Sequence, residues 1–137
     1  MRNILVDAGA IIGLLNPAHR FHDRAHAFFS TLRGTDQLFT TWPVITECTF
    51  ALIRNRDALF EWLRAGALGV INFGLDELSS IKQVMDCYSD REVDFADASL
   101  IWLATEKQTN LIATTDFNDF EAYRIGNKKS FKNLIAR

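Results

Sequence analysis

The chain contains little cysteine, proline or glycine. Two of its 137 residues are cysteine, which cannot supply a disulfide framework, so a reducing environment is expected. Cys48 and Cys87 also lack the short spacing of a zinc ligand pair. With 2 proline and 7 glycine residues, the chain holds no linker-like or low-complexity tract. No internal repeat is present either, so a single domain spanning residues 1–137 is predicted.

Long hydrophobic runs are also missing. The first apolar stretch, Ile4 to Leu15, is too short to cross a membrane and is interrupted by Asp7. It leads into Asn16-Pro17 rather than a small-residue cleavage site, which argues against a signal peptide. We therefore expect a soluble, cytoplasmic protein without membrane association.

Charge of one sign is not in excess over the whole chain. Lys and Arg number 15 and Asp and Glu 17, a formal net charge of −2 that excludes a polybasic nucleic-acid binder. The sum hides an asymmetry, because residues 124–137 carry five basic side chains and no acidic one. The preceding residues then hold ten basic and seventeen acidic side chains. Nucleic acid as a substrate therefore remains open.

Short apolar runs alternate with segments of helical periodicity along the chain. The runs predict strands at residues 4–6, 38–40, 69–73 and 111–114, with a fifth short strand near 123–125. Helical periodicity is present at residues 10–15, 25–32, 43–52, 59–63, 78–88 and 96–104. Strands that alternate with helices indicate an α/β fold, with a mostly parallel sheet of four to five strands and helices on both faces.

Two carboxylates follow strands directly. Asp7 ends the first predicted strand and Asp116 stands just past the fourth. Ligands of open α/β sheets bind beyond the carboxyl ends of the strands, so both acids are candidates for one shared site. Alternatively, each merely starts a turn or caps the following helix, as Asp often does.

Glu47 and Asp97 strengthen the functional interpretation. Each has apolar neighbours on its helix: Val44 and Ala51 for Glu47, Leu100 and Ile101 for Asp97. Both carboxylates are therefore expected beside packed surface, where an unpaired charge is costly. Asp94 lies one turn before Asp97, either on about the same side or as the cap of that helix.

Acids that converge without matching bases repel one another, and a divalent cation would resolve the repulsion. Carboxylate oxygens suit Mg²⁺, or alternatively Mn²⁺. Such an ion polarises a phosphoryl oxygen and activates water. The pattern therefore predicts metal-assisted hydrolysis of a phosphate ester.

Four segments, in order, resemble the motifs of PIN-domain ribonucleases, and VapC-type toxins of toxin–antitoxin pairs most closely. They are Val6-Asp7-Ala8-Gly9-Ala10-Ile11-Ile12, Thr46-Glu47, Asp94-Phe95-Ala96-Asp97-Ala98 and Thr114-Thr115-Asp116-Phe117-Asn118-Asp119-Phe120. The resemblance spans essentially the whole chain. It implies a three-layer α/β/α fold and an Mg²⁺- or Mn²⁺-dependent endoribonuclease. It further implies an RNA substrate, homodimerisation and neutralisation by a cognate antitoxin.

Carried over position by position, the acidic quartet of the family falls on Asp7, Glu47, Asp97 and Asp116. These four are the predicted catalytic and metal-binding residues, with Glu47 binding directly or through water. Asp94 matches a less constant accessory position, and Asp119 resembles a loop residue. Many relatives have Thr or Ser after the first Asp, where this chain has Ala8, so Thr115 is a candidate to supply the missing hydroxyl.

Two other functions compete with a nuclease. A PIN-like module could bind RNA or protein without cutting, although such a scaffold has no need of four clustered carboxylates. A haloacid-dehalogenase-like phosphatase also has Asp after its first strand, but needs a second Asp two residues later, where this chain has Gly9. The basic tail from Arg124 to Arg137 could hold phosphates, as could the basic side chains near the first loops, Arg20, His22, Arg24 and Arg33; alternatively, these side chains form an ordinary solvated surface. Trp42 is the aromatic residue expected nearest a substrate path.

Overall fold

The apolar run that opens the chain forms the central strand of the sheet. The computed structural model describes residues 1–126 and 128–137. In it, strand β1 (Asn3–Val6) lies between β2 (Gln37–Thr41) and β4 (Leu111–Ala113). The sheet has the order β3-β2-β1-β4-β7, with β3 at Gly69–Ile71 and β7 at Lys132–Asn133, and every pairing is parallel. The predicted mostly parallel sheet is confirmed.

The fifth strand is not the one predicted. Residues 124–125 do form a strand, β5 (Arg124–Ile125), but it pairs antiparallel with β6 (Lys129–Ser130) in a separate two-stranded sheet. The fifth strand of the central sheet is β7, which pairs with β4 through Lys132 and Asn133. A polar two-residue strand at a sheet edge leaves no apolar run in the sequence, so periodicity could not reveal it.

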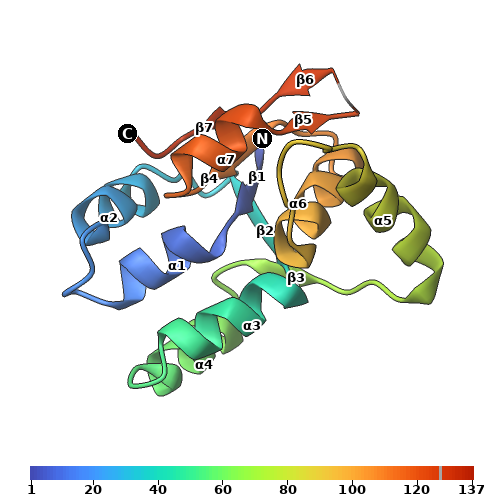
Figure 1. Cartoon of the computed structure of the whole chain (residues 1–137). Helices are drawn as coiled ribbons and strands as arrows, with labels where there is room; N and C mark the ends of the chain where they lie inside the picture. The colour runs from blue at the N-terminus through green and yellow to red at the C-terminus, as the bar shows by residue number, and fades with distance from the viewer. Residues whose placement is uncertain (127) are drawn as a thin grey trace.

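Helices cover both faces of this sheet, as expected for a three-layer α/β/α fold. Helices α1 and α2 lie on one side of the central strands, and α5 and α6 lie on the other (Figure 1). The helices are α1 (Ala8–Leu15), α2 (His22–Ser30), α3 (Trp42–Ala51), α4 (Arg56–Arg64), α5 (Leu78–Asp86), α6 (Phe95–Glu106) and α7 (Phe117–Ala122), and a 3₁₀ turn at Leu75–Glu77 precedes α5.

Aspartates define where three of these helices begin. Asp7, Asp94 and Asp116 are the N-cap residues of α1, α6 and α7, and each side chain accepts a backbone N–H of its own helix. The alternative interpretation, that these acids cap helices, is therefore confirmed. Since a cap engages one carboxylate oxygen, it does not exclude a second role for the other.

Helix α6 is the most buried helix of the described residues. Its hydrophobic residues Ala98, Leu100, Ile101 and Leu103 are at most 2% exposed. A helix that is apolar on nearly every side belongs in the core, and α6 packs against β2 and β1. Asp97, which lies in its first turn, is consequently buried as well.

Among the described residues, no helix is both long and apolar enough to cross a membrane. The longest hydrophobic helix, α6, has 12 residues. This length is well short of the ~20 residues that a membrane span requires.

A close approach between α1 and the loop after β4 depends on Gly9. A Cβ atom built on Gly9 would lie 2.0 Å from the hydroxyl oxygen and 3.2 Å from the Cβ of Thr115. The first turn of α1 can therefore lie against this loop only because residue 9 has no side chain. The same loop continues directly into Asp116.

We expect Gly9→Ala to lower the free energy of unfolding by about 1–3 kcal/mol, the usual cost of an overpacked contact. Chemical denaturation measures the loss. The matched control is Gly34→Ala, where an added Cβ meets nothing within 4 Å. Because Thr115 Oγ1 is the nearest obstacle, adding Thr115→Ala should recover part of the loss. Equal stabilities for Gly9→Ala and Gly34→Ala would contradict the proposed contact.

Candidate metal centre

Two adjacent strands place the first pair of polar side chains side by side. In the register of β1 and β4, Val6 pairs with Ala113, so Asp7 and Thr114 leave the sheet together. The Thr114 hydroxyl donates to Asp7 Oδ2 at 2.8 Å and accepts the Asp116 backbone N–H at 3.0 Å. Asp7 Oδ1 accepts the Ala8 N–H at 2.8 Å. One buried hydroxyl thus links both strand-end acids.

Asp97 enters from helix α6 and is held by two further residues. Its backbone N–H donates to Asp94 Oδ1 at 2.8 Å, which fixes the first turn of the helix. Its side-chain Oδ2 accepts the Tyr123 hydroxyl at 2.8 Å. Tyr123 is 1% exposed, so this hydrogen bond lies in the protein interior. Asp97 therefore keeps a defined orientation although it is a buried acid.

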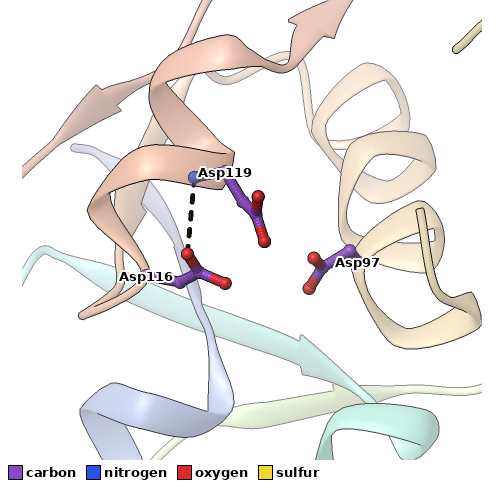
Figure 2. Close-up of side chains that lie close together, drawn as sticks. All are labelled: Asp97, Asp116 and Asp119. Carbon is purple, nitrogen blue, oxygen red and sulfur yellow. Dashed lines mark hydrogen bonds between the residues drawn. The ribbon is translucent and has the colours of Figure 1, made fainter. Parts of the chain in front are cut away.

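Three carboxylates converge at this edge of the sheet. Asp97, Asp116 and Asp119 each offer an oxygen, and these oxygens lie within 4.8 Å of one another. Figure 2 shows the three side chains pointing toward a common space between α6 and α7. The Asp119 N–H donates to Asp116 Oδ1 at 3.4 Å, which is the N-cap contact of α7.

The position of Asp119 differs from the one that the sequence predicts. The residue lies in the first turn of α7, not in a loop. A signal was available, because Asp116-Phe117-Asn118-Asp119 repeats the Asp-Phe-x-Asp pattern of residues 94–97. In both segments the first Asp caps a helix and accepts the N–H of the second. The same pattern therefore delivers an acid to the site from each of two helices.

Glu47 and Asp94 border a neighbouring groove. This groove has a volume of about 620 Å³ and is lined partly by Trp42, Phe73 and Phe95. The side chain of Glu47 is exposed rather than covered, although partial burial is the largest cause of its raised pKa. The buried residues of α3 are Val44, Ile45 and Cys48, and Glu47 is not among them. Glu47 and Asp7 do not belong to the group of oxygens that lie within 4.8 Å of one another, although the charge of Asp7 acts on Asp97 and the charge of Asp116 acts on Glu47.

Burial, and to a smaller extent the neighbouring carboxylates, raise the pKa values of the acids in the site. Burial, followed by the charge of Asp7, raises the pKa of Asp97 to about 8 although the Tyr123 hydrogen bond acts against the shift. Partial loss of solvent together with Asp7, Asp94 and Asp116 raises the pKa of Glu47 to about 7. Burial and Asp119 raise the pKa of Asp116 to about 6. Burial also raises the pKa of Asp7, against the hydrogen bonds from Thr114 and Ala8.

Burial is the largest cause of each shift, and the neighbouring carboxylates add to it. Among the described residues, Arg91 is the base that forms an ion pair with the trio, through Asp119 at 2.7 Å. A divalent cation offsets clustered carboxylates, and oxygen donors are what Mg²⁺ and Mn²⁺ prefer. The donor set at Asp97, Asp116 and Asp119 therefore fits such a cation.

The surroundings of the acids include three side chains that the sequence analysis did not single out. Thr114, rather than the expected Thr115, supplies the hydroxyl that contacts Asp7. Tyr123 and Arg91 contact Asp97 and Asp119 from segments distant in sequence. Partners of this kind orient metal-binding carboxylates in many proteins, and a linear pattern does not identify them.

Comparisons with known proteins agree with this architecture. A family model described as the PIN domain matches residues 4–126. No curated protein matches the sequence significantly. A solved structure of VapC20 from Mycobacterium tuberculosis, described as a toxin that cleaves the sarcin–ricin loop, has a TM-score of 0.72 and 20% sequence identity, covering 88% of this chain and 96% of VapC20. The structure of FitAcB from Neisseria gonorrhoeae has a TM-score of 0.59 and 18% identity, covering 94% of this chain and 96% of that one.

Without a divalent cation, the free energy of unfolding should fall as the pH rises from about 4 to about 8. The folded protein retains protons on Asp116, Glu47 and Asp97, whose pKa values are about 6, 7 and 8, after the unfolded chain has released them. This stabilisation is complete below the ordinary carboxyl pKa and is lost as the pH passes the raised values. Urea denaturation in EDTA from pH 4.5 to 9 measures it.

In the same series, Asp97→Asn should flatten the upper part of the pH dependence and stabilise the cation-free protein near pH 8. The control Asp57→Asn, an exposed substitution on α4, should retain the wild-type profile. An Asp97→Asn protein with an unchanged profile would show that Asp97 does not hold a proton in this pH range.

We expect Thr114→Val to reduce affinity for Mg²⁺ by 10- to 100-fold, as is typical when a partner of a metal-binding carboxylate is lost. The substitution keeps the side-chain shape but removes the donor to Asp7 and the acceptor of the Asp116 N–H. Isothermal titration calorimetry measures the affinity. Thr31→Val is the control, because the Thr31 hydroxyl, at the C-cap of α2, bonds among the described residues to the Phe28 carbonyl of that helix. Equal affinities for the two variants would exclude a supporting role for Thr114.

Proposed function

Because this chain belongs to the PIN domain family, we propose that it is a metal-dependent endoribonuclease that hydrolyses phosphodiester bonds in RNA. The observation that carries the proposal is the convergence of Asp97, Asp116 and Asp119 at the carboxyl edge of the sheet. A phosphodiester is itself an anion. A site built from carboxylates can therefore accept it only when a cation offsets their charge.

The proposed metal ligands are Asp7, Asp97 and Asp116, with Glu47 acting directly or through water. Asp119 joins them, because its oxygen lies in the same group as those of Asp97 and Asp116. Asp94 is an additional candidate from the rim of the groove. The expected ion is Mg²⁺, with Mn²⁺ as the alternative.

When bound, the cation supplies Lewis-acid polarisation of the scissile phosphoryl group and activates water. The chain's own residues prepare the site for it. Thr114 holds Asp7 relative to the Asp116 backbone, and Tyr123 holds one oxygen of Asp97 by a hydrogen bond. Burial of Asp7 and Asp97 limits water around the negative charge, so a cation interacts more strongly there than with exposed acids.

The groove beside the acids favours RNA over a small phosphomonoester. Trp42 is 51% exposed and Phe95 is 40% exposed, and both line this groove next to Glu47 and Asp94. Exposed aromatic rings are the side chains on which unstacked RNA bases are held. A phosphatase for small substrates would not need such a surface.

The proposed biological role is the toxin of a toxin–antitoxin pair, acting on RNA in the cytoplasm. The support is the fold similarity to VapC20, which is described as a toxin. The proposed protein partners are a cognate antitoxin and a second copy of the chain in a homodimer. Phe50 and Ile53 are 74% and 59% exposed near the end of α3, and apolar side chains exposed to this extent suit a protein interface.

The proposal predicts RNA cleavage that needs Mg²⁺ or Mn²⁺ and stops in EDTA. Asp97→Asn, Asp116→Asn and Asp119→Asn should each lower the rate by about 100-fold or more, because a weakened cation site loses several kcal/mol of charge stabilisation. Gel analysis of a structured RNA incubated with each variant measures the rate. Asp57→Asn on α4 is the matched control and should cleave like the wild type.

Other outcomes would favour the competing functions. Cleavage that is equal with Mg²⁺ and with EDTA would refute a metal-dependent nuclease. Tight RNA binding without cleavage of any RNA offered would support a binding module. Hydrolysis of p-nitrophenyl phosphate in place of RNA would support a phosphatase.

A further inference from the structure

A second hollow borders Asp116 on the side of helix α2. Its volume is about 410 Å³, and its walls include Arg20, Phe21, Arg24, Asp116, Phe117 and Arg137. Three arginines thus reach one cavity from chain segments that are more than a hundred residues apart. Asp116 belongs both to this cavity and to the carboxylate trio, so the two sites are direct neighbours.

A pair of aromatic rings holds the arginines in place. Phe21 and Phe117 pack edge to face, with ring centroids 5.7 Å apart and an interplanar angle of 78°. The Cζ atoms of Arg20 and Arg24 lie 4.4 and 5.5 Å from the centroid of Phe21. Guanidinium groups stacked on a ring lose less conformational freedom when they bind a ligand than groups that move freely in solvent.

Arg137 reaches the same pair of rings from the C-terminal segment. Its Cζ atom lies 5.8 Å from the centroid of Phe117. Its guanidinium donates to Glu121 Oε2 at 2.9 Å and also bonds to Asn118. Arg137 is thereby fixed at the wall of the cavity, with part of its charge already offset.

The other two arginines carry charge that no acid offsets. Among the residues that the structure describes, neither Arg20 nor Arg24 forms an ion pair. Three arginines against Asp116 leave the wall of the cavity positively charged, in a chain whose total charge is −2. A guanidinium presents a planar pair of donors that matches two oxygens of a phosphate. The cavity therefore has the charge and the donors of an anion site.

We propose that the cavity formed by Arg20, Phe21, Arg24 and Arg137 binds a backbone phosphate of the substrate RNA next to the bond that is cleaved. The proposal rests on the proposed function for the identity of the anion. It adds a direction to the substrate path, because the strand would pass from the arginine cavity across the carboxylate trio toward the aromatic groove at Trp42. Contacts to phosphate position a strand and carry no base specificity, so RNA of any sequence should engage the cavity.

The test is binding of a fluorescein-labelled, 15-nucleotide single-stranded RNA of mixed sequence, followed by fluorescence anisotropy in Mg²⁺. Every protein in the series carries Asp97→Asn so that the RNA stays intact. The test variant is Arg20→Ala with Arg24→Ala. The matched control is Arg54→Ala with Arg64→Ala, which removes the same charge from exposed positions outside the cavity.

We expect the test pair to raise the Kd about tenfold or more and to lower the slope of log K against log salt by about 1.4, the value for two lost contacts to a single strand. The control pair should leave both quantities close to those of the parent protein. Arg20→Lys with Arg24→Lys should keep the salt slope but bind more weakly than the parent, because Lys lacks the paired donors. Thermal melting of each variant verifies that it is folded.

Equal weakening by the test pair and the control pair would overturn the proposal, since only the total charge would then matter. Absence of RNA binding by the parent protein would overturn it as well. Failure of the proposed function is recognised separately, because it is measured as absence of cleavage by the wild type. If the protein binds RNA through Arg20 and Arg24 but never cuts it, the proposed phosphate site is supported and the proposed nuclease activity is refuted.

Discussion

The parallel pairing of β1 with β4 is the constraint on which the site depends. Because Val6 pairs with Ala113, the next residues, Asp7 and Thr114, leave the sheet side by side. The Thr114 hydroxyl then joins Asp7 to the backbone of Asp116. On the other side of β1 lies β2, so the strand order switches here: β2 and β3 extend the sheet on one side of β1, and β4 and β7 extend it on the other. Open α/β sheets bind ligands at such a switch, because the connections that leave the two strands diverge and open a crevice.

Helix capping reduces the cost of bringing the acids together. Asp7, Asp94 and Asp116 each begin a helix, where unpaired N–H groups and the helix dipole favour negative charge. Structural capping and metal binding are therefore compatible in this protein, since each carboxylate keeps an oxygen for further contacts. Capping does not offset the full cost of burying carboxylates close together, because the pKa values of Asp97 and Asp116 remain raised. A cation can supply the remaining stabilisation.

The distribution of charge around the trio is more informative than the net charge of the chain. An aromatic groove with Trp42 lies beside Glu47 and Asp94, and a cavity with three arginines lies beside Asp116. The basic C-terminal segment contributes to this arrangement through Arg137, whose guanidinium lies near Phe117. An anionic strand would thus meet positive charge at one end of the path and ring surfaces at the other. In the proposed arrangement the strand would be held by groups other than the carboxylates, which repel a phosphate unless a cation is bound.

The sequence by itself determined the α/β class, four of the five central strands and the strand-end positions of Asp7 and Asp116. These features are local, because apolar runs and the residues that end them can be recognised one segment at a time. Only the tertiary structure decided that Asp119 joins Asp97 and Asp116, that Thr114 rather than Thr115 contacts Asp7, and that Glu47 is exposed at a groove. It also decided that β7 completes the sheet and that Arg137 lines the same cavity as Arg20 and Arg24. The physical reason is that these contacts join segments far apart in the chain, and side-chain direction at an element's end depends on the packing of its neighbours.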